Sequence, residues 1–108
     1  MWIKINGRNK RSNILIGVFY RSEKMLSFKD WLDNFEETIA YVKSVWDGPI
    51  LLTGDFNINL MIESPDKNSY IDVLEQFNLT QVIKQPTRST NTSSTLIDHM
   101  IVSHTEIV

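Results

Sequence analysis

The chain has no cysteine, and this absence excludes disulfide bonds, thiolate nucleophiles and cysteine-based zinc sites. It also has no long hydrophobic run, because each apolar stretch is interrupted within a few residues. Neither a secretory signal nor a membrane-spanning helix is therefore predicted. An excess of basic charge is missing too, since the formal net charge is -2 and no positive field over the whole molecule favours nucleic acid. We expect an intracellular protein, cytoplasmic or nuclear, without a membrane partner.

The composition indicates one folded domain. The hydrophobic fraction of 42% and the charged fraction of 22% are typical of globular proteins and not of disordered chains. A chain of 108 residues buries roughly 65% of its unfolded surface, which is enough for one core and too little for a large enzyme. We find no internal repeat, linker or low-complexity tract, so residues 1–108 are interpreted as one unit.

The longest predicted helix covers residues 27–46. Apolar side chains recur there at helical spacing: Phe28, Trp31, Leu32, Phe35, Ile39, Val42 and Val45 or Trp46. Ser27 with Asp30 resembles a capping box, and the run Asp47-Gly48-Pro49 ends the helix. An aromatic stripe of this kind is typical of a core, so we expect Trp31 and Phe35 to pack against a sheet.

Strands are predicted on both sides of this helix. Residues 2–5 and 13–20 indicate a hairpin, and the second run is apolar enough to be buried on both faces. The polar turn between them carries a basic cluster, which fits a solvated turn or, alternatively, a phosphate contact: Arg8, Lys10 and Arg11. The short apolar run 50–53 completes a strand, helix, strand crossover beside or near the strand that ends at Tyr20, which predicts a layered α/β fold.

The second half of the chain gives weaker signals. We predict, in order, an ambiguous run at 58–62, a loop at 64–68, a helix at 69–77, a short edge strand at 79–83, an exposed loop at 85–95 and a strand at 96–102.

The run Gly54-Asp55-Phe56-Asn57 directly follows the buried strand. A carboxylate and a carboxamide at the C-terminal end of such a strand are typical of a ligand site in an open α/β sheet. The same residues fit a turn in which Asp55 or Asn57 caps the following segment. The tetrad alone leaves both interpretations open.

A second carboxylate, Asp98, stands inside the predicted strand 96–102. A buried charge there needs a partner, because an isolated buried charge costs several kcal/mol. His99 is not that partner, since adjacent residues of a strand point to opposite faces. We interpret His99 as a core or edge histidine and His104 as a surface residue.

Three segments, taken together, resemble a known superfamily. They are Val18-Phe19-Tyr20-Arg21, the tetrad at 54–57, and Pro86-Thr87-Arg88 followed by Thr95-Leu96-Ile97-Asp98-His99. In this order they resemble the endonuclease/exonuclease/phosphatase superfamily, which has the DNase I-like fold. The resemblance is strongest to the endonuclease domain of non-LTR retrotransposon polyproteins and extends from Trp2 to Ser103.

The resemblance implies an α/β (α+β) fold, a four-layered α/β/β/α sandwich with mixed sheets. Residues 1–108 would form its middle to C-terminal part, without the N-terminal half and the last strands. In the family that half supplies an Asn and a metal-binding Glu, and a closing Ser-Asp-His motif supplies the catalytic histidine. We therefore expect a partial domain whose exposed strand edges can associate with a partner.

The resemblance also implies a function, the metal-dependent hydrolysis of a phosphodiester in target DNA. By position, Asp55 would orient and deprotonate the attacking water, and Asn57 would hold a phosphate oxygen. Tyr20 would hydrogen-bond the phosphate or the leaving oxygen, and Asp98 would orient the histidine. Mg²⁺ is the expected cofactor and the DNA backbone the expected partner. Because the main metal ligand is not in the chain, we expect the isolated chain to be inactive or catalytically crippled.

Other functions fit the same residues. Phosphoinositide phosphatases, sphingomyelinases and nucleotide deadenylases share the fold and similar motifs, and substrate choice depends largely on loops. A non-catalytic α/β interaction module is the alternative outside enzymes.

Overall fold

The computed structural model describes residues 1–7, 13–22, 24, 26–90 and 92–104. The predicted basic cluster of Arg8, Lys10 and Arg11 lies outside these residues. The elements are β1 (Trp2–Ile5), β2 (Ile14–Tyr20), α1 (Phe28–Val45), β3 (Ile50–Asp55), α2 (Pro65–Gln76), β4 (Thr80–Gln81), β5 (Arg88–Ser89), β6 (Ser94–Thr95) and β7 (Asp98–Val102).

The main sheet is mixed and has five strands in the order β1-β2-β3-β7-β4. β1 and β2 form the predicted antiparallel hairpin. β2 and β3 are parallel neighbours joined through α1, which confirms the predicted crossover. β7 lies antiparallel between β3 and β4, and β4 is the edge strand expected near residues 79–83, although it has only two residues. The fold is thus α+β with a mixed sheet, as predicted.

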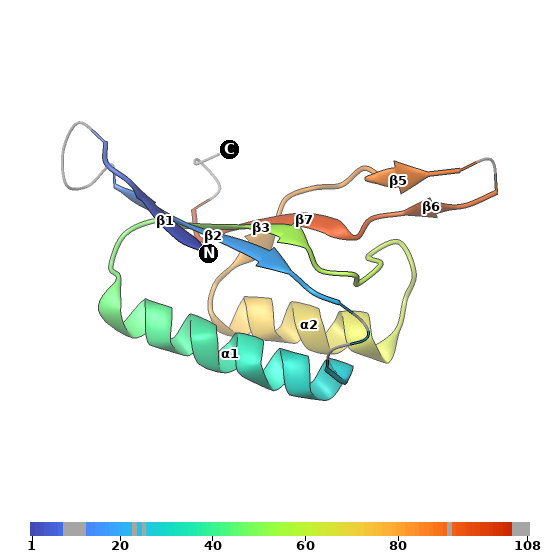
Figure 1. Cartoon of the computed structure of the whole chain (residues 1–108), viewed down its shortest axis with the longest axis horizontal. Coiled ribbons are helices and arrows are strands. Elements are labelled where there is room, and N and C mark those ends of the chain that lie inside the picture. The colour runs from blue at the N-terminus through green and yellow to red at the C-terminus, as the bar shows by residue number, and fades with distance from the viewer. Residues whose placement is uncertain (8–12, 23, 25, 91, 105–108) are drawn as a thin grey trace.

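Both helices cover the same face of this sheet (Figure 1). Side chains from β3 and β7 that point to the helices are fully buried, among them Leu52 and Ile101, each 0% exposed. Phe56, also 0% exposed, packs at the centre of an aromatic group that includes Trp31 and Phe35 of α1. The predicted packing of this aromatic stripe against the sheet is confirmed.

In the described part of the chain, the opposite face of the sheet is largely uncovered over β1 and β2, although Val102 of β7, which also lies on this face, is buried. Its residues on β1 and β2 include Ile3, Ile5 and Val18, which are 43%, 48% and 37% exposed. The prediction that residues 13–20 are buried on both faces is therefore wrong, because the helices cover only the face of Leu15 and Phe19. One helical layer on one main sheet corresponds to half of the layers of the predicted α/β/β/α sandwich.

The helix boundaries follow from their caps. Ser27 Oγ accepts a hydrogen bond from Asp30 N at 3.2 Å, as expected for α1. The predicted loop at 64–68 is wrong, because α2 already begins at Pro65. Ser64 caps this helix by accepting from Lys67 N at 3.0 Å, and proline is favoured in the first turn because its missing N–H needs no partner there.

The segment 85–95 is exposed, as predicted, but it is not only loop. β5 and β6 pair in a small antiparallel sheet with Arg88 opposite Thr95, and this hairpin extends away from the helices in Figure 1. Thr90 Oγ1 accepts from Ser93 N at 3.0 Å and closes the turn. Apolar periodicity could not reveal this hairpin, because side-chain and backbone hydrogen bonds hold it together. Among the described helices, none combines the length and the apolar character needed to cross a membrane.

Candidate functional site

Three of the four predicted site residues form one row across the main sheet. Tyr20 of β2 pairs in register with Asp55 of β3, and Asp55 pairs with Asp98 of β7. Cross-strand partners project from the same face, and this row lies on the open face, since the next residue of β7, His99, points to the helices. The Tyr20 residue is 72% exposed, and the side chains of Asp55 and Asp98 are 19% and 37% exposed. The parallel strands β2 and β3 both end here, so the row lies at the C-terminal ends of these two strands.

Asp55 is held by two hydrogen bonds. Its Oδ1 accepts from the backbone N–H of Asn57 at 3.0 Å, and its Oδ2 accepts from Nη2 of Arg88 at 3.1 Å. The first bond confirms the turn interpretation of the tetrad. The turn interpretation and the site interpretation therefore do not exclude each other. One carboxylate oxygen of Asp55 closes the turn, and the other accepts from Arg88 on the side of the row.

Arg88 links the two carboxylates and was not among the predicted site residues. Besides its bond to Asp55, its Nε lies 3.6 Å from Oδ2 of Asp98. Two acidic side chains on neighbouring strands repel each other unless a cation lies between them, and the β5 hairpin brings Arg88 there. The sequence did contain a signal for Arg88. Asp98 was expected to need a partner, and the motif Pro86-Thr87-Arg88 supplies a basic residue. Because the side chain of Asp98 is 37% exposed, the prediction of a buried acid is wrong, while the prediction of a partner is confirmed.

Asn57 lies just past the row and turns toward the helix side. Its φ of 52° is in the left-handed region, which asparagine tolerates better than most residues. Its Nδ2 donates to the backbone oxygen of Arg21 at 2.6 Å. One of the two amide hydrogens is thereby used, and the loops after β2 and β3 are fixed to each other.

Gly54 allows the strands to approach beside the row. Its φ is +144°, and a Cβ at this position would overlap the carbonyl oxygen of Phe19 on β2. Only glycine fits a backbone of this kind. Because Gly54 has no side chain, β2 and β3 can stay paired up to Asp55.

His99 belongs to the core and not to the row. It is 1% exposed, stacks on Phe56 with ring centroids 5.1 Å apart, and places Nε2 at 3.0 Å from the carbonyl oxygen of Ile58. A nitrogen facing a carbonyl must carry the proton, so Nδ1 accepts the hydrogen bond from the Tyr70 hydroxyl at 2.9 Å. Burial lowers the pKa of His99, while carbonyl and carboxylate neighbours partly oppose this effect. Burial also raises the pKa of Tyr70. The predictions of a core His99 and an exposed His104 are confirmed.

The described residues do not by themselves fit a magnesium ion. Within the described ranges there is no cluster of three or more histidine, cysteine or acidic side chains able to hold a metal. The row offers two carboxylates, and the guanidinium of Arg88 contacts both. A divalent cation between them would have to displace this positive charge or find further ligands.

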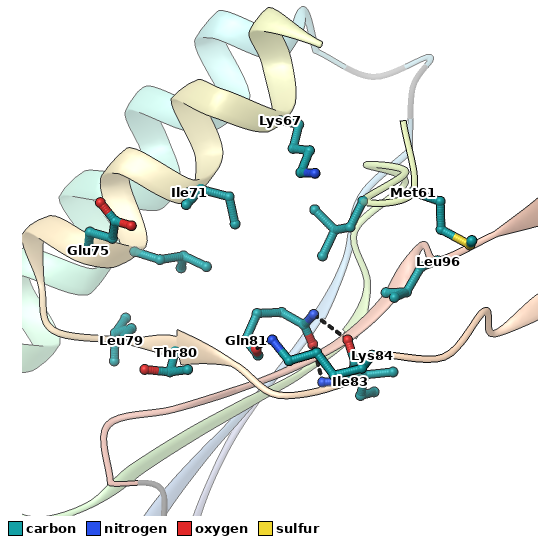
Figure 2. Close-up of a pocket in the computed structure, with 12 residues that line it drawn as sticks. Met61, Lys67, Ile71, Glu75, Leu79, Thr80, Gln81, Ile83, Lys84 and Leu96 are labelled. Atoms are coloured by element: carbon teal, nitrogen blue, oxygen red, sulfur yellow. Dashed lines mark hydrogen bonds between the residues drawn. The ribbon is translucent and has the colours of Figure 1, made fainter. Parts of the chain in front are cut away.

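One described cavity is separate from the row. It has a volume of about 540 Å³ and opens between α2 and the edge strand β4 (Figure 2). Its wall is mixed, with apolar side chains such as Ile71 and Leu79 and charged side chains such as Lys67, Glu75 and Lys84. Because it contains no residue of the row, its size does not make it the site of the chemistry.

The comparisons with known proteins support the fold. No protein-family model matches the chain, and a search of curated proteins gives no match either. Among solved structures, the endonuclease domain of TRAS1, a telomere-specific non-LTR retrotransposon, is similar with a TM-score of 0.71 and 13% sequence identity. The match covers 93% of this chain and 47% of that structure. The chain therefore has the fold of this endonuclease domain, as the sequence motifs predict, and spans about half of its length.

Proposed function

We propose that the chain carries part of a phosphodiester-cleaving centre of the kind found in DNA endonucleases of non-LTR retrotransposons. The observation that carries this proposal is the row of Tyr20, Asp55 and Asp98 at the C-terminal ends of β2 and β3, in a chain with the fold of such a domain. A phenol, two carboxylates and a guanidinium on an open surface suit a phosphate diester better than an apolar ligand.

Each side chain has a definite task in this proposal. Asp55 orients the attacking water and takes its proton, since among the described residues the exposed Arg88 alone holds its Oδ2. Asn57 donates its second amide hydrogen to a phosphate oxygen, and Tyr20 donates its hydroxyl to the phosphate or to the leaving oxygen. Asp98 orients a histidine supplied by the rest of the domain. Arg88 releases Asp55 and contacts the charged phosphate oxygens, for which a guanidinium is well suited.

Mg²⁺ remains the predicted cofactor, because a hard cation neutralises phosphate charge during hydrolysis. The described residues do not fit this ion alone, so we assign no step to it. For the same reason we propose that the isolated chain cleaves DNA poorly. The loss of one member of a cooperative catalytic set costs about four orders of magnitude or more in rate.

The first experiment measures nicking of supercoiled plasmid by the isolated chain in Mg²⁺, with EDTA and Asp55→Ala as controls. We expect nicking no faster than that of Asp55→Ala. Robust nicking that Asp55→Ala abolishes would show that the chain is a complete catalyst and would contradict the proposed deficiency.

The second experiment tests the chemistry itself in a chimera. Residues 1–108 replace the structurally matched part of the TRAS1 endonuclease domain, and cooperative unfolding verifies that the chimera is folded. We expect Mg²⁺-dependent nicking that Asp55→Ala or Asp98→Ala lowers at least about a hundredfold. Asp33→Ala, an exposed carboxylate of α1, is the matched control and should change nothing. A folded chimera that is silent, or one insensitive to Asp55→Ala, would overturn the proposal.

A further inference from the structure

Arg21, the residue after the row's Tyr20, has an unusual environment. It is 8% exposed, and its guanidinium carbon lies 5.3 Å from the ring centre of Phe28 and 5.5 Å from that of Trp31. Nη1 donates to the carbonyl oxygens of Phe56 at 3.4 Å and Asn57 at 3.2 Å. Nε is buried without a hydrogen-bond partner, and within the described ranges no carboxylate lies within ion-pair distance of the guanidinium.

This arrangement leaves a buried positive charge only partly compensated. Arginine does not lose its proton in proteins, so the charge cannot be avoided by titration. Two carbonyl oxygens and two aromatic faces offset part of the desolvation cost. A buried charge without a counter-charge nevertheless costs several kcal/mol, and proteins usually pair such a group or use it to bind.

Arg21 lines a pocket of about 350 Å³. Phe28, Asn57 and Ser64 also line it. Ser64 is the N-cap of the 12-residue helix α2, so the positive end of the helix dipole also faces the pocket. Asp66, in the first turn of this helix, is the one acidic residue among the described pocket-lining residues.

We propose that this pocket binds a phosphoryl group, with the forked guanidinium of Arg21 as its main ligand. The pocket lies on the helix side of the sheet, since Arg21 packs on two rings of that side, whereas the row of Asp55 and Asp98 lies on the open face. Asn57 is assigned to both places, but Arg21, the main ligand, is not part of the row, so Arg21 variants test the pocket separately from hydrolysis. Asp66 opposes the bound anion and limits its affinity.

The test is a titration of the whole chain with inorganic phosphate. Two-dimensional ¹H–¹⁵N NMR spectra follow the signals of the Arg21 guanidinium and of the backbone amides of Asn57 and Ser64. We expect these signals to shift together and to saturate. Arg21→Met should weaken binding about tenfold or more, and Asp66→Asn should tighten it severalfold. Lys43→Gln, which removes a basic residue in the last turn of α1 and away from the pocket lining, is the control and should leave the titration unchanged.

Two further measurements keep the outcome decisive. Arg21→Lys keeps the charge but loses the fork, so a folded Lys variant should still bind more weakly than the native chain, even if Arg21→Met does not fold. A nucleoside monophosphate and a short single-stranded DNA, added as competitors, distinguish a free nucleotide from a nucleic-acid backbone as the source of the phosphoryl group. No saturable shift at Arg21, equal binding by the Arg21 variants, or a loss of folding stability in Asp66→Asn without tighter binding would overturn the proposal. The last result would make Asp66 the internal counter-charge of Arg21.

Discussion

Gly54→Ala should be the most damaging small substitution near the row. At φ of +144° an alanine costs about 1 to 3 kcal/mol in backbone strain. Its Cβ would also overlap the carbonyl oxygen of Phe19, which is the register partner of Gly54 on β2. The strands must then separate locally and lose at least one ladder hydrogen bond, which adds about 1 kcal/mol. We expect a total loss of about 2 to 4 kcal/mol in the free energy of unfolding.

Urea unfolding followed by tryptophan fluorescence measures this loss. Such a loss is a large fraction of the roughly 5 to 15 kcal/mol that holds a domain folded, so the midpoint should fall sharply or folding should fail. Gly48→Ala is the matched control. The three atoms nearest to its Cβ would belong to the Trp46 ring, 3.2 Å away, and Gly48 lacks a positive φ, so the effect should stay within about 1 kcal/mol. A loss below about 1 kcal/mol for Gly54→Ala would show that the backbone relaxes freely and would refute the argument.

Two further predictions concern the buried hydrogen bond behind the row. Tyr70→Phe leaves Nδ1 of His99 without a donor and should lower the free energy of unfolding by about 1 to 3 kcal/mol, whereas Tyr41→Phe, at a residue 67% exposed, should not; equal effects in urea unfolding would contradict this. The lowered pKa of His99 predicts a pH dependence. Unfolded His99 titrates near 6.5 and the folded residue at lower pH, so its contribution is complete above about pH 6.5 and is lost as the pH falls toward the folded pKa, by at most about 1.4 kcal/mol per pH unit. His99→Gln should flatten this dependence and His104→Gln should not, as urea midpoints at a series of pH values will show.

Much of the fold could be predicted because single physical signals dominate it. The helical spacing of Trp31 and Phe35 and the cap at Ser27 define α1, and the apolar run before Gly54 defines β3. The start of α2 was missed because its first turn is polar and resembles a loop, although Ser64-Pro65 is itself a helix start signal. Apolar periodicity indicates which side chains are buried. A solvated first turn has no buried side chains, so it shows no apolar periodicity.

The site could be predicted in part for a related reason. The sequence motifs indicated Tyr20, Asp55 and Asp98, and the register of three strands brings them together. Arg88 was missed because its position depends on the β5 and β6 hairpin, which has no apolar pattern. The burial of β2 was overestimated because an apolar strand has the same sequence whether one or both of its faces are covered. What covers a face is a property of other segments.

The open face of the sheet has a thermodynamic consequence. The chain has an accessible surface of 7118 Å², whereas a compact monomer of its mass of 12.6 kDa exposes about 6,200 Å². Apolar side chains on this face, such as those of Ile3, Ile5 and Val18, are already partly hydrated in the folded chain. The heat capacity of unfolding should therefore be smaller than the typical value of about 12 to 15 cal/mol/K per residue. A smaller heat capacity change flattens the curve of stability against temperature. The chain should thus be less sensitive to cold than a domain whose sheet is covered on both sides.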